Sequence, residues 1–388
     1  MTVTSPQGFR AAGITAGLKA SGKPDMALVV NDGPDRNAAA VFTSNRVAAA
    51  PVRWSKQVVT DGRVDAVVLN SGGANACTGP KGFQNTHTTA EKTADALGIS
   101  AGDVVVCSTG LIGEQLPMDK IIPGIDSLAS ALSEDGGHDA AVAIMTTDTV
   151  PKEAVFTGAD TQGVEFTIGG IAKGAGMLAP GLATMLVVLT TDAEVHPEVL
   201  DAALRDATRV TFDRADSDGC MSTNDTVVLM ASGASGAVPD TAAFTAGLTQ
   251  VCAELARMLI GDAEGAAHDI AIRTFNAASE RDAETVSRAV ARSNLFKTAI
   301  FGKDPNWGRV LSAVGTTDAA FEPDSLNVSI NGVQICQNGG IGQDRSLVDL
   351  EPREVLVEID LAAGDAEATI WTNDLTHDYV HENSAYSS

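Results

Sequence analysis

The chain has 388 residues, of which 44% are apolar and 20% charged, and it carries a net charge of −24 with an isoelectric point of about 4.4. This length suits one large or two ordinary domains, with enough material for a hydrophobic core. So acidic a chain argues against binding to nucleic-acid phosphates or to an anionic membrane, which need clustered Lys and Arg, although a few local cations still allow small anionic substrates.

The first half of the chain alternates short apolar runs with segments of helical periodicity. The Thr-Gly pair at 109–110 ends one of the strand-like runs, and Pro123 interrupts one of the helical segments. We expect strands over 26–30, 38–43, 64–70 and 103–114, a glycine-rich loop over 70–82, helices over 88–99, 118–132 and 138–149, and a hairpin over 153–171.

In the second half, Asn331-Gly332 is a strong signal for a tight hairpin turn. We expect strands over 185–191, 226–233, 268–275 and 354–361, a strand over 367–372 paired with the last of these, helices over 197–212, 241–260 and 281–296, and a hairpin over 326–336. Strands and helices mix without strict alternation. This predicts an α+β protein with sheets sandwiched by helices, rather than a doubly wound parallel sheet.

The chain has five cysteines, namely Cys77, Cys107, Cys220, Cys252 and Cys336. No pair has CxxC spacing, so we expect reduced, mostly buried thiols in a cytoplasmic protein. The N-terminal segment lacks the apolar stretch of a secretory signal, and no run is long enough to span a bilayer. His377 and His381 are four residues apart, but nothing completes a metal site, and we expect both at the surface.

The segment KGAGMLAPGLATML contains a match to the dinucleotide fingerprint G-x-G-x-x-[GA], from Gly174 to Ala179. That fingerprint requires a following helix, whose N-terminus holds the pyrophosphate. The residues that follow are Pro-Gly and then the β-branched run MLVVLTT, which favours a strand. The context therefore argues against nucleotide binding.

The same segment places Thr184 at the start of that strand. A threonine hydroxyl becomes a useful nucleophile when a base lies beside it, and its own α-amine serves once the preceding peptide bond is cut. Gly174, Gly176 and Gly181 allow unusual dihedral angles, and Ala183 leaves its carbonyl accessible. A threonine that merely caps the strand entry is the alternative. The Thr-Gly turn follows the strand VVVC, and its amides and hydroxyl are candidates for an oxyanion hole. The alternative is an ordinary turn from a strand into a loop.

The stretch KGAGMLAPGLATMLVVLTTDA (173–193) closely resembles the nucleophile region of ornithine acetyltransferases, the glutamate N-acetyltransferases of the cyclic arginine pathway. Further blocks resemble that family in family order, so that the likeness covers essentially the whole chain: AIMTTDTVPKEA (143–154), DGCMSTNDTV (218–227), DAEGAA (262–267), LFKTAIFGKDPNWGRV (295–310) and HENSAYSS (381–388).

The resemblance implies a self-processing α+β fold in which the precursor cuts itself between Ala183 and Thr184. It implies an α chain of residues 1–183 and a β chain of residues 184–388, assembled as an α2β2 heterotetramer. Thr184 would take the acetyl group from N2-acetylornithine and pass it to glutamate in a ping-pong reaction. No tightly bound cofactor is implied, and some members also use acetyl-CoA as the acetyl donor.

The resemblance also implies roles for single residues. Thr109 and Gly110 match the oxyanion pair. Positions that match the substrate contacts, together with Thr184, are Thr146, Lys173, Glu264, Asn383 and Ser388. Charge is consistent with this, because Lys173 suits a substrate carboxylate and Glu264 suits the cationic ornithine side chain.

Other residues of these blocks are expected to support the site or to lie apart from it. We interpret Asn224 and Asp225 as structural support and Trp307 as a packing anchor. Two positions depart from the family pattern. We expect His268 to be a surface replacement rather than a residue that tunes the pocket next to Glu264. We expect Cys220 to be a buried thiol rather than a nucleophile, because nothing nearby in sequence would lower its pKa.

Two other classes of function stay open from sequence. A related self-processing aminopeptidase or amidase would use water as the acceptor, and glutamate-dependent turnover would distinguish it. An uncleaved binding protein, in which Thr184 is structural, would give an intact chain without acetyl transfer.

Overall fold

The computed structural model describes residues 2–179 and 185–385. The chain divides into two compact units, each assembled from separate stretches of sequence. Unit 1 consists of residues 1–175, 181–213 and 221–259, and unit 2 consists of residues 176–180, 214–220 and 260–388.

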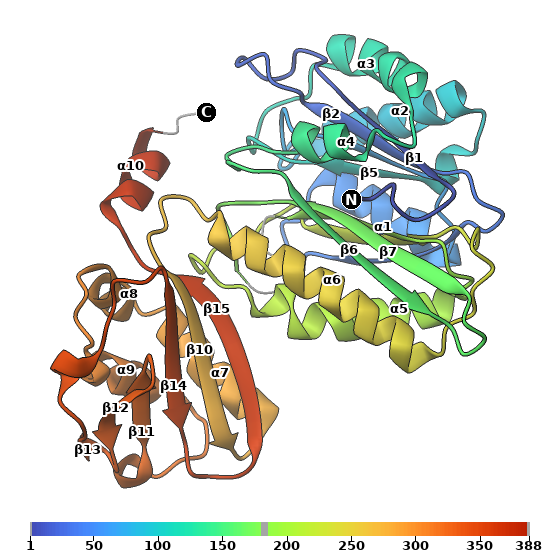
Figure 1. Ribbon diagram of the computed structural model, residues 1–388. Coiled ribbons are helices and arrows are strands. Elements are labelled where there is room, and N and C mark those ends of the chain that lie inside the picture. The colour runs from blue at the N-terminus through green and yellow to red at the C-terminus, as the bar shows by residue number, and fades with distance from the viewer. Residues whose placement is uncertain (1, 180–184, 386–388) are drawn as a thin grey trace. The chain divides into compact units, whose positions relative to one another are not determined.

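Unit 1 contains two sheets (Figure 1). The five-stranded sheet has the order β3-β9-β8-β7-β6, with bounds Asn37–Phe42, Thr226–Ala231, Leu186–Thr191, Glu165–Lys173 and Lys152–Ala159. The four-stranded sheet has the order β1-β2-β4-β5, with bounds Phe9–Ile14, Met26–Asn31, Ala66–Asn70 and Val104–Ser108. In each sheet one pair is parallel, β8 with β9 and β4 with β5.

The two sheets of unit 1 pack face to face, and helices cover their outer faces. Side chains of both sheets share one apolar core, while α2 and α3 pack on the far side of the four-stranded sheet. Phe244 of α6 lies against Phe166 of β7, and Figure 1 shows α5 and α6 running across that sheet. The helices are α1 Ala50–Val58, α2 Gly79–Leu97, α3 Met118–Ala131, α4 Gly137–Ala143, α5 Pro197–Val210 and α6 Thr241–Gly261. Because strands such as β8 are buried on both faces, their sequences are continuously apolar.

Unit 2 contains one sheet of six strands in the order β13-β12-β11-β14-β10-β15. These span Gly340–Ile341, Val333–Gln337, Asn327–Ile330, Glu354–Asp360, Asp269–Ala277 and Ala366–Asn373. Its core lies between the sheet and the helices α7 to α9, while the alternate residues of β14 are exposed. The helices are α7 Glu280–Ala291, α8 Asn294–Phe301, α9 Trp307–Val314 and α10 His377–Ala385. Trp307 packs against this core, as predicted.

The α+β class and the helix-covered sheets are confirmed, but several local predictions are wrong. Strand β15 pairs with β10, and β10 separates it from β14. The predicted helix over 281–296 is two helices, because Ser293 caps a new one by accepting from Phe296 N at 3.3 Å. Helix α2 begins at Gly79, inside the predicted loop. Pro123 lies inside α3 without ending it, since burial of Ile121, Ile125 and Leu128 holds that helix on its sheet.

Strand β14 offers a test of which face carries the stability of unit 2. Ile359 is fully buried, whereas Leu356 on the opposite face is 39% exposed. We expect Ile359→Ala to lower the free energy of unfolding by about 2–5 kcal/mol, because it leaves a cavity in the core. Leu356→Ala is the matched control and is expected to cost less than about 1 kcal/mol. Denaturant titration of both variants checks this, and equal losses would contradict the assignment of faces.

Candidate active site

Three of the predicted site residues, Ala183, Thr184 and Ser388, lie outside the described residues. The described residues nearest to Ala183 and Thr184 are Ala179 and Met185. Lys173 is the last residue of β7 and is paired with Leu186 at the start of β8. A strand therefore follows the glycine-rich segment where the dinucleotide fingerprint would need a helix, as predicted.

In unit 1, Lys173 lies against the predicted oxyanion pair. Its side chain is buried, and its Nζ donates to Thr109 Oγ1 at 3.3 Å. The Thr109 amide donates to Asn70 O at 3.0 Å, which leaves the hydroxyl as the group that Thr109 offers to a ligand. Gly110 has a φ of 130°, and a Cβ there would lie 2.8 Å from Gly73 N. Only glycine fits this position.

The Gly110 amide completes the pair of donors. Among the hydrogen bonds of the described residues, none uses Gly110 N–H. A free amide next to a buried threonine hydroxyl is the composition of an oxyanion hole. These two groups follow β5 at the carboxyl end of its parallel pair with β4, so a packed sheet holds them in place.

Asp148 connects Lys173 with another predicted contact, Thr146. Its Oδ1 accepts from Lys152 Nζ and from Gly174 N, both at 2.6 Å, and its Oδ2 accepts from Thr146 N at 2.9 Å. Asp148 and Lys152 are both fully buried at their side chains. The Asp148 carboxylate therefore fixes the backbone at Thr146 and at Gly174.

The site in unit 1 is rich in positive charge. Burial raises the pKa of Asp148, but the charges of Lys173 and Lys152 outweigh it and lower that pKa to about 2. Burial, helped by the charge of Lys173, lowers the pKa of Lys19 to about 8. Three lysines thus lie near one ionised aspartate. This excess of positive charge suits a ligand that carries a carboxylate.

Asn224 and Asp225 have the supporting contacts that were expected of them. Asn224 Nδ2 donates to Ala74 O at 2.6 Å and to Ser108 O at 2.8 Å, and so holds the loop after β4 beside the end of β5. Asp225 Oδ1 accepts from Met185 N at 3.1 Å. Burial raises the pKa of Asp225 well above its ordinary value.

In unit 2, Glu264 and Asn383 are brought together. Asn383 Nδ2 of α10 donates to Glu264 Oε2 at 3.0 Å. A Cβ at Gly176 would lie 2.5 Å from the same oxygen, so the glycine loop passes directly over this carboxylate. Gly265 has a φ of 62°, and a Cβ there would meet Tyr379 N at 2.2 Å. Glycine at 265 therefore allows the start of α10 to lie beside Glu264.

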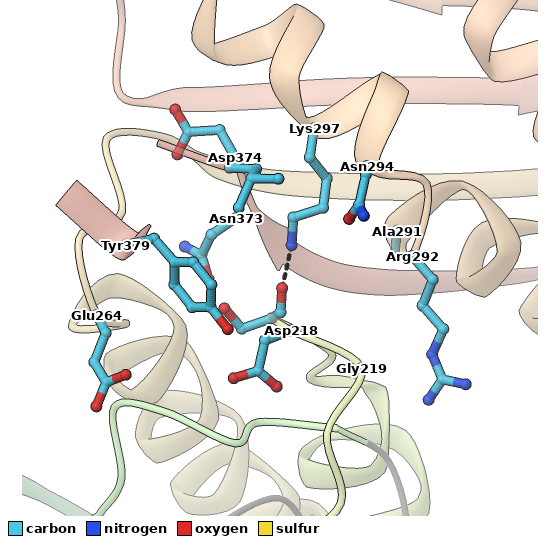
Figure 2. A pocket seen from close by; sticks show the side chains of 12 residues that line it. Asp218, Gly219, Glu264, Ala291, Arg292, Asn294, Lys297, Asn373, Asp374 and Tyr379 are labelled. Atoms are coloured by element: carbon cyan, nitrogen blue, oxygen red, sulfur yellow. Dashed lines mark hydrogen bonds between the residues drawn. The ribbon is translucent and has the colours of Figure 1, made fainter. Parts of the chain in front are cut away.

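Glu264 also lines a cavity of about 500 Å³ within unit 2 (Figure 2). Tyr379 and Asp218 lie near Glu264, and Lys297, Asn294 and Arg292 line the other side. Burial, with the nearby charges of Asp218 and Glu264, raises the pKa of Tyr379 to about 12. This volume is typical of a site for a small molecule.

Sequence reasoning missed Asp148, Lys152 and the far side of this cavity. The spacing of Asp148 and Lys152, four residues apart in MTTDTVPK, was the available signal for an ion pair. For Lys297 the signal was a single cation within the apolar run LFKTAIF, which places it on the buried face of α8.

Two expectations about family departures are wrong. His268 is buried, and its Nδ1 lies 2.7 Å from Asp374 Oδ2 and its Nε2 3.1 Å from Leu350 O, so it joins two loops of unit 2. Cys220 is exposed, because it lies on a loop. Partial burial and the neighbouring Asp218 raise the pKa of Cys220, which does not favour a nucleophilic thiolate.

Within residues 2–179 and 185–385, no three His, Cys, Asp or Glu side chains are grouped so as to hold a metal ion. Over the same part of the chain, none of the helices combines the length and apolar character that crossing a membrane requires.

Comparison with known proteins gives a consistent result. A sequence model of the ArgJ family matches residues 10–388. The arginine biosynthesis bifunctional protein ArgJ of Streptomyces coelicolor is 68% identical, and that of Thermobifida fusca is 64% identical, each over the whole of both chains. Among solved structures, the ornithine acetyltransferase of Mycobacterium tuberculosis complexed with ornithine is 54% identical, with a TM-score of 0.44 over 48% of this chain and 96% of that one.

The buried Asp148–Lys152 pair predicts a specific acid sensitivity. The pKa of Asp148 is lower in the folded chain than the ordinary 3.8, so the stabilisation is complete above about pH 4 and is lost as the pH falls towards 2. It amounts to roughly 2 kcal/mol. Asp148→Asn should remove this acid-dependent part and should cost about 3–5 kcal/mol at pH 7, because Lys152 stays buried without its partner.

Asp95→Asn is the matched control, because Asp95 pairs with Lys92 at 3.0 Å on the surface. An exposed pair of this kind contributes about 0–1 kcal/mol. Unfolding titrations at pH 7, 4 and 2 check the prediction. A loss for Asp148→Asn no greater than that for Asp95→Asn would show that Asp148 does not hold the site together.

Proposed function

This chain belongs to the ArgJ family, and from that premise we propose that it transfers an acetyl group from N2-acetylornithine to glutamate through an acetyl ester on Thr184. It is an acetyltransferase of arginine biosynthesis. The observation that carries the mechanism is the contact of Lys173 Nζ with Thr109 Oγ1, beside an unused Gly110 amide and next to the strand that Met185 leads into.

The first step of the proposal is self-cleavage. The Thr184 hydroxyl attacks the Ala183 carbonyl, the bond from that carbonyl to the Thr184 nitrogen breaks, and the nitrogen takes up a proton. Water then hydrolyses the ester. The products are an α chain of residues 1–183 and a β chain of residues 184–388, whose new α-amine has a pKa near working pH and acts as the base for its own hydroxyl.

Acetyl transfer then follows in two halves. The Thr184 hydroxyl attacks the acetyl carbonyl of N2-acetylornithine, and ornithine leaves with the proton on its α-nitrogen. The α-amine of glutamate attacks the acetyl ester, the bond from the acetyl carbonyl to the Thr184 oxygen breaks, and that oxygen takes up the proton lost by the amine as N-acetylglutamate leaves. The carbonyl oxygen becomes negative in both halves, and the Thr109 hydroxyl and the Gly110 amide stabilise it.

The remaining predicted residues bind substrate in this proposal. Lys173, held on Asp148 through Gly174, lies in the cationic region that suits the substrate α-carboxylate. The backbone amide of Thr146 donates to the same carboxylate, that of Asp148. Glu264 binds the side-chain ammonium of ornithine, assisted by Asn383, and Ser388 contributes from the C-terminus.

Three broader features belong to the same proposal. The bifunctional name of the relatives supports a second activity, with acetyl-CoA as an alternative acetyl donor and no tightly bound cofactor. We expect an α2β2 heterotetramer of the cleaved chains. We also expect a cytoplasmic enzyme, because its substrates are metabolites of amino-acid biosynthesis and its cysteines are unpaired.

Self-cleavage is tested by intact-mass spectrometry of the purified protein. We expect two fragments with a break between Ala183 and Thr184. Thr184→Ala should give a single uncut chain, because the nucleophile is gone. Thr60→Ala is the matched control, since its exposed hydroxyl bonds only within a helix end, and it should be cut normally. An uncut chain for the unmodified protein would remove this mechanism and favour a binding protein.

Gly176→Ala tests the position of Glu264. The added Cβ would lie 2.5 Å from Glu264 Oε2, so the carboxylate must move away. We expect KM for N2-acetylornithine to rise about tenfold, which corresponds to about 1.4 kcal/mol of binding. Gly340→Ala, whose Cβ meets nothing closer than 3.5 Å, should leave KM unchanged. An unchanged KM for Gly176→Ala would show that Glu264 does not bind this substrate.

A further inference from the structure

The proposed reaction requires one site to bind two substrates whose side chains carry opposite charges. N2-acetylornithine and glutamate share an α-carboxylate and react at the same α-nitrogen. Their side chains carry opposite charges, an ammonium on the first and a carboxylate on the second. A pocket that stabilises only one of these would discriminate strongly against the other, because an unpaired charge in a buried site is costly.

The cavity of unit 2 has charged groups of both signs at its two ends. Figure 2 shows Glu264 and Tyr379 on one side and Lys297, Asn294 and Arg292 on the other, with Asp218 between them. Asp218 is held by two backbone amides, since it accepts from Met177 N at 2.7 Å and from Cys220 N at 3.0 Å. Glu264 thus lies on the opposite side of the cavity from Lys297 and Arg292.

Lys297 supplies positive charge that its own contacts do not neutralise. It is only 6% exposed. Its Nζ donates to the Ser217 carbonyl and to Thr372 Oγ1 at 3.3 Å, both of which are uncharged. Burial lowers the pKa of Lys297, while the more distant Asp218, Asp216 and Asp374 oppose that shift. A carboxylate entering the cavity would stabilise this ammonium further.

The other carboxylates near Lys297 are already occupied. Asp374 accepts from the amides of Ala267 and His268 and from the His268 ring. Asp216 accepts from Gly219 N, and its Oδ2 pairs with both Arg288 and Arg292, at 3.3 and 2.8 Å. Arg288 has a second carboxylate partner in Glu284, so Asp216 balances the charge of Arg292. Arg292 binds Asp216 through Nε, and among the hydrogen bonds of the described residues none uses its terminal amino groups, which leaves these donors for a ligand.

We propose that Lys297, Arg292 and Asn294 form the site for the side-chain carboxylate of glutamate, at the opposite end of the cavity from Glu264, which takes the side-chain ammonium of N2-acetylornithine. This inference rests on the proposed function. Arg292 offers a planar pair of donors, Asn294 an amide and Lys297 a buried point charge, and together they match a carboxylate. One cavity thus accepts two substrates of opposite side-chain charge without rearrangement.

Arg292→Gln separates the two half-reactions. We expect KM for glutamate to rise about tenfold, a change of about 1.4 kcal/mol. The exchange of acetyl between N2-acetylornithine and labelled ornithine, which needs no glutamate, should stay within about twofold. The preference for glutamate over glutamine should fall, because glutamine has the same shape without the charge. Arg288→Gln is the matched control, since Arg288 pairs with the same Asp216 but does not line the cavity.

Three results would overturn the inference: an unchanged KM for glutamate, an equal rise in both half-reactions, or the same rise for Arg288→Gln. A failure of the proposed function gives a different result, since the unmodified protein would then show no ornithine exchange. In that case, calorimetric titration with glutamate would test binding to the cavity without any need for turnover. Weaker binding to Arg292→Gln than to the unmodified protein supports the site, and equal binding or none rejects it.

Discussion

The ion pair between Asp148 and Lys152, 2.6 Å long and fully buried, is the interaction on which the site in unit 1 depends. Such a pair is costly to bury and is worthwhile where its remaining lone pairs hold other groups in place. Here the carboxylate also holds Gly174 N and Thr146 N, on either side of the β6–β7 hairpin. Lys173 is thereby fixed within reach of Thr109, and the donors and cations of the site form one connected network.

The distribution of charge explains how so acidic a protein can bind anionic substrates. The net charge of −24 resides largely on the surface, while Lys152, Lys173 and Lys297 are buried beside the two sites. Buried cations act in a medium of low polarity and are weakly screened, so a few of them dominate their own pocket. The acidic exterior repels polyanions, and the interior still attracts a small carboxylate.

The sequence predicted the parts of this protein that local physics decides. The alternation EVLVEIDL specified a half-buried strand, and the apolar run after Thr184 specified a buried one. Pairing of β15 with β10 was not predictable, because nothing in either strand encodes its neighbour. The burial of His268 was missed for a related reason. Its partner Asp374 is 106 residues away, and only the folded chain brings them together.

The same limit applied to the site. Family blocks named Thr109, Lys173 and Glu264, and the structure gives each of them a specific partner. Asp148 was missed because its importance lies in the backbone groups that it holds in place, and Arg292, which the proposed glutamate site uses, was missed because its cavity forms only on folding. A charge that shares its counter-ion with another, as Arg292 does, looks in sequence like any other surface arginine.

The position of β8 constrains the order of events in the proposed self-cleavage. β8 lies between β7 and β9 in the five-stranded sheet, so the bond proposed to break lies between two strands that pair along the whole of β8. Fragments synthesised separately would each expose an open apolar sheet edge, which invites aggregation. Under the proposed cleavage, covalent continuity through residues 174–185 would keep β7 and β8 together while the sheet assembles, and the hydrogen bonds between the strands would hold them afterwards. In the proposed maturation, synthesis as one polypeptide therefore assists assembly of the sheet, and the connection is cut only afterwards.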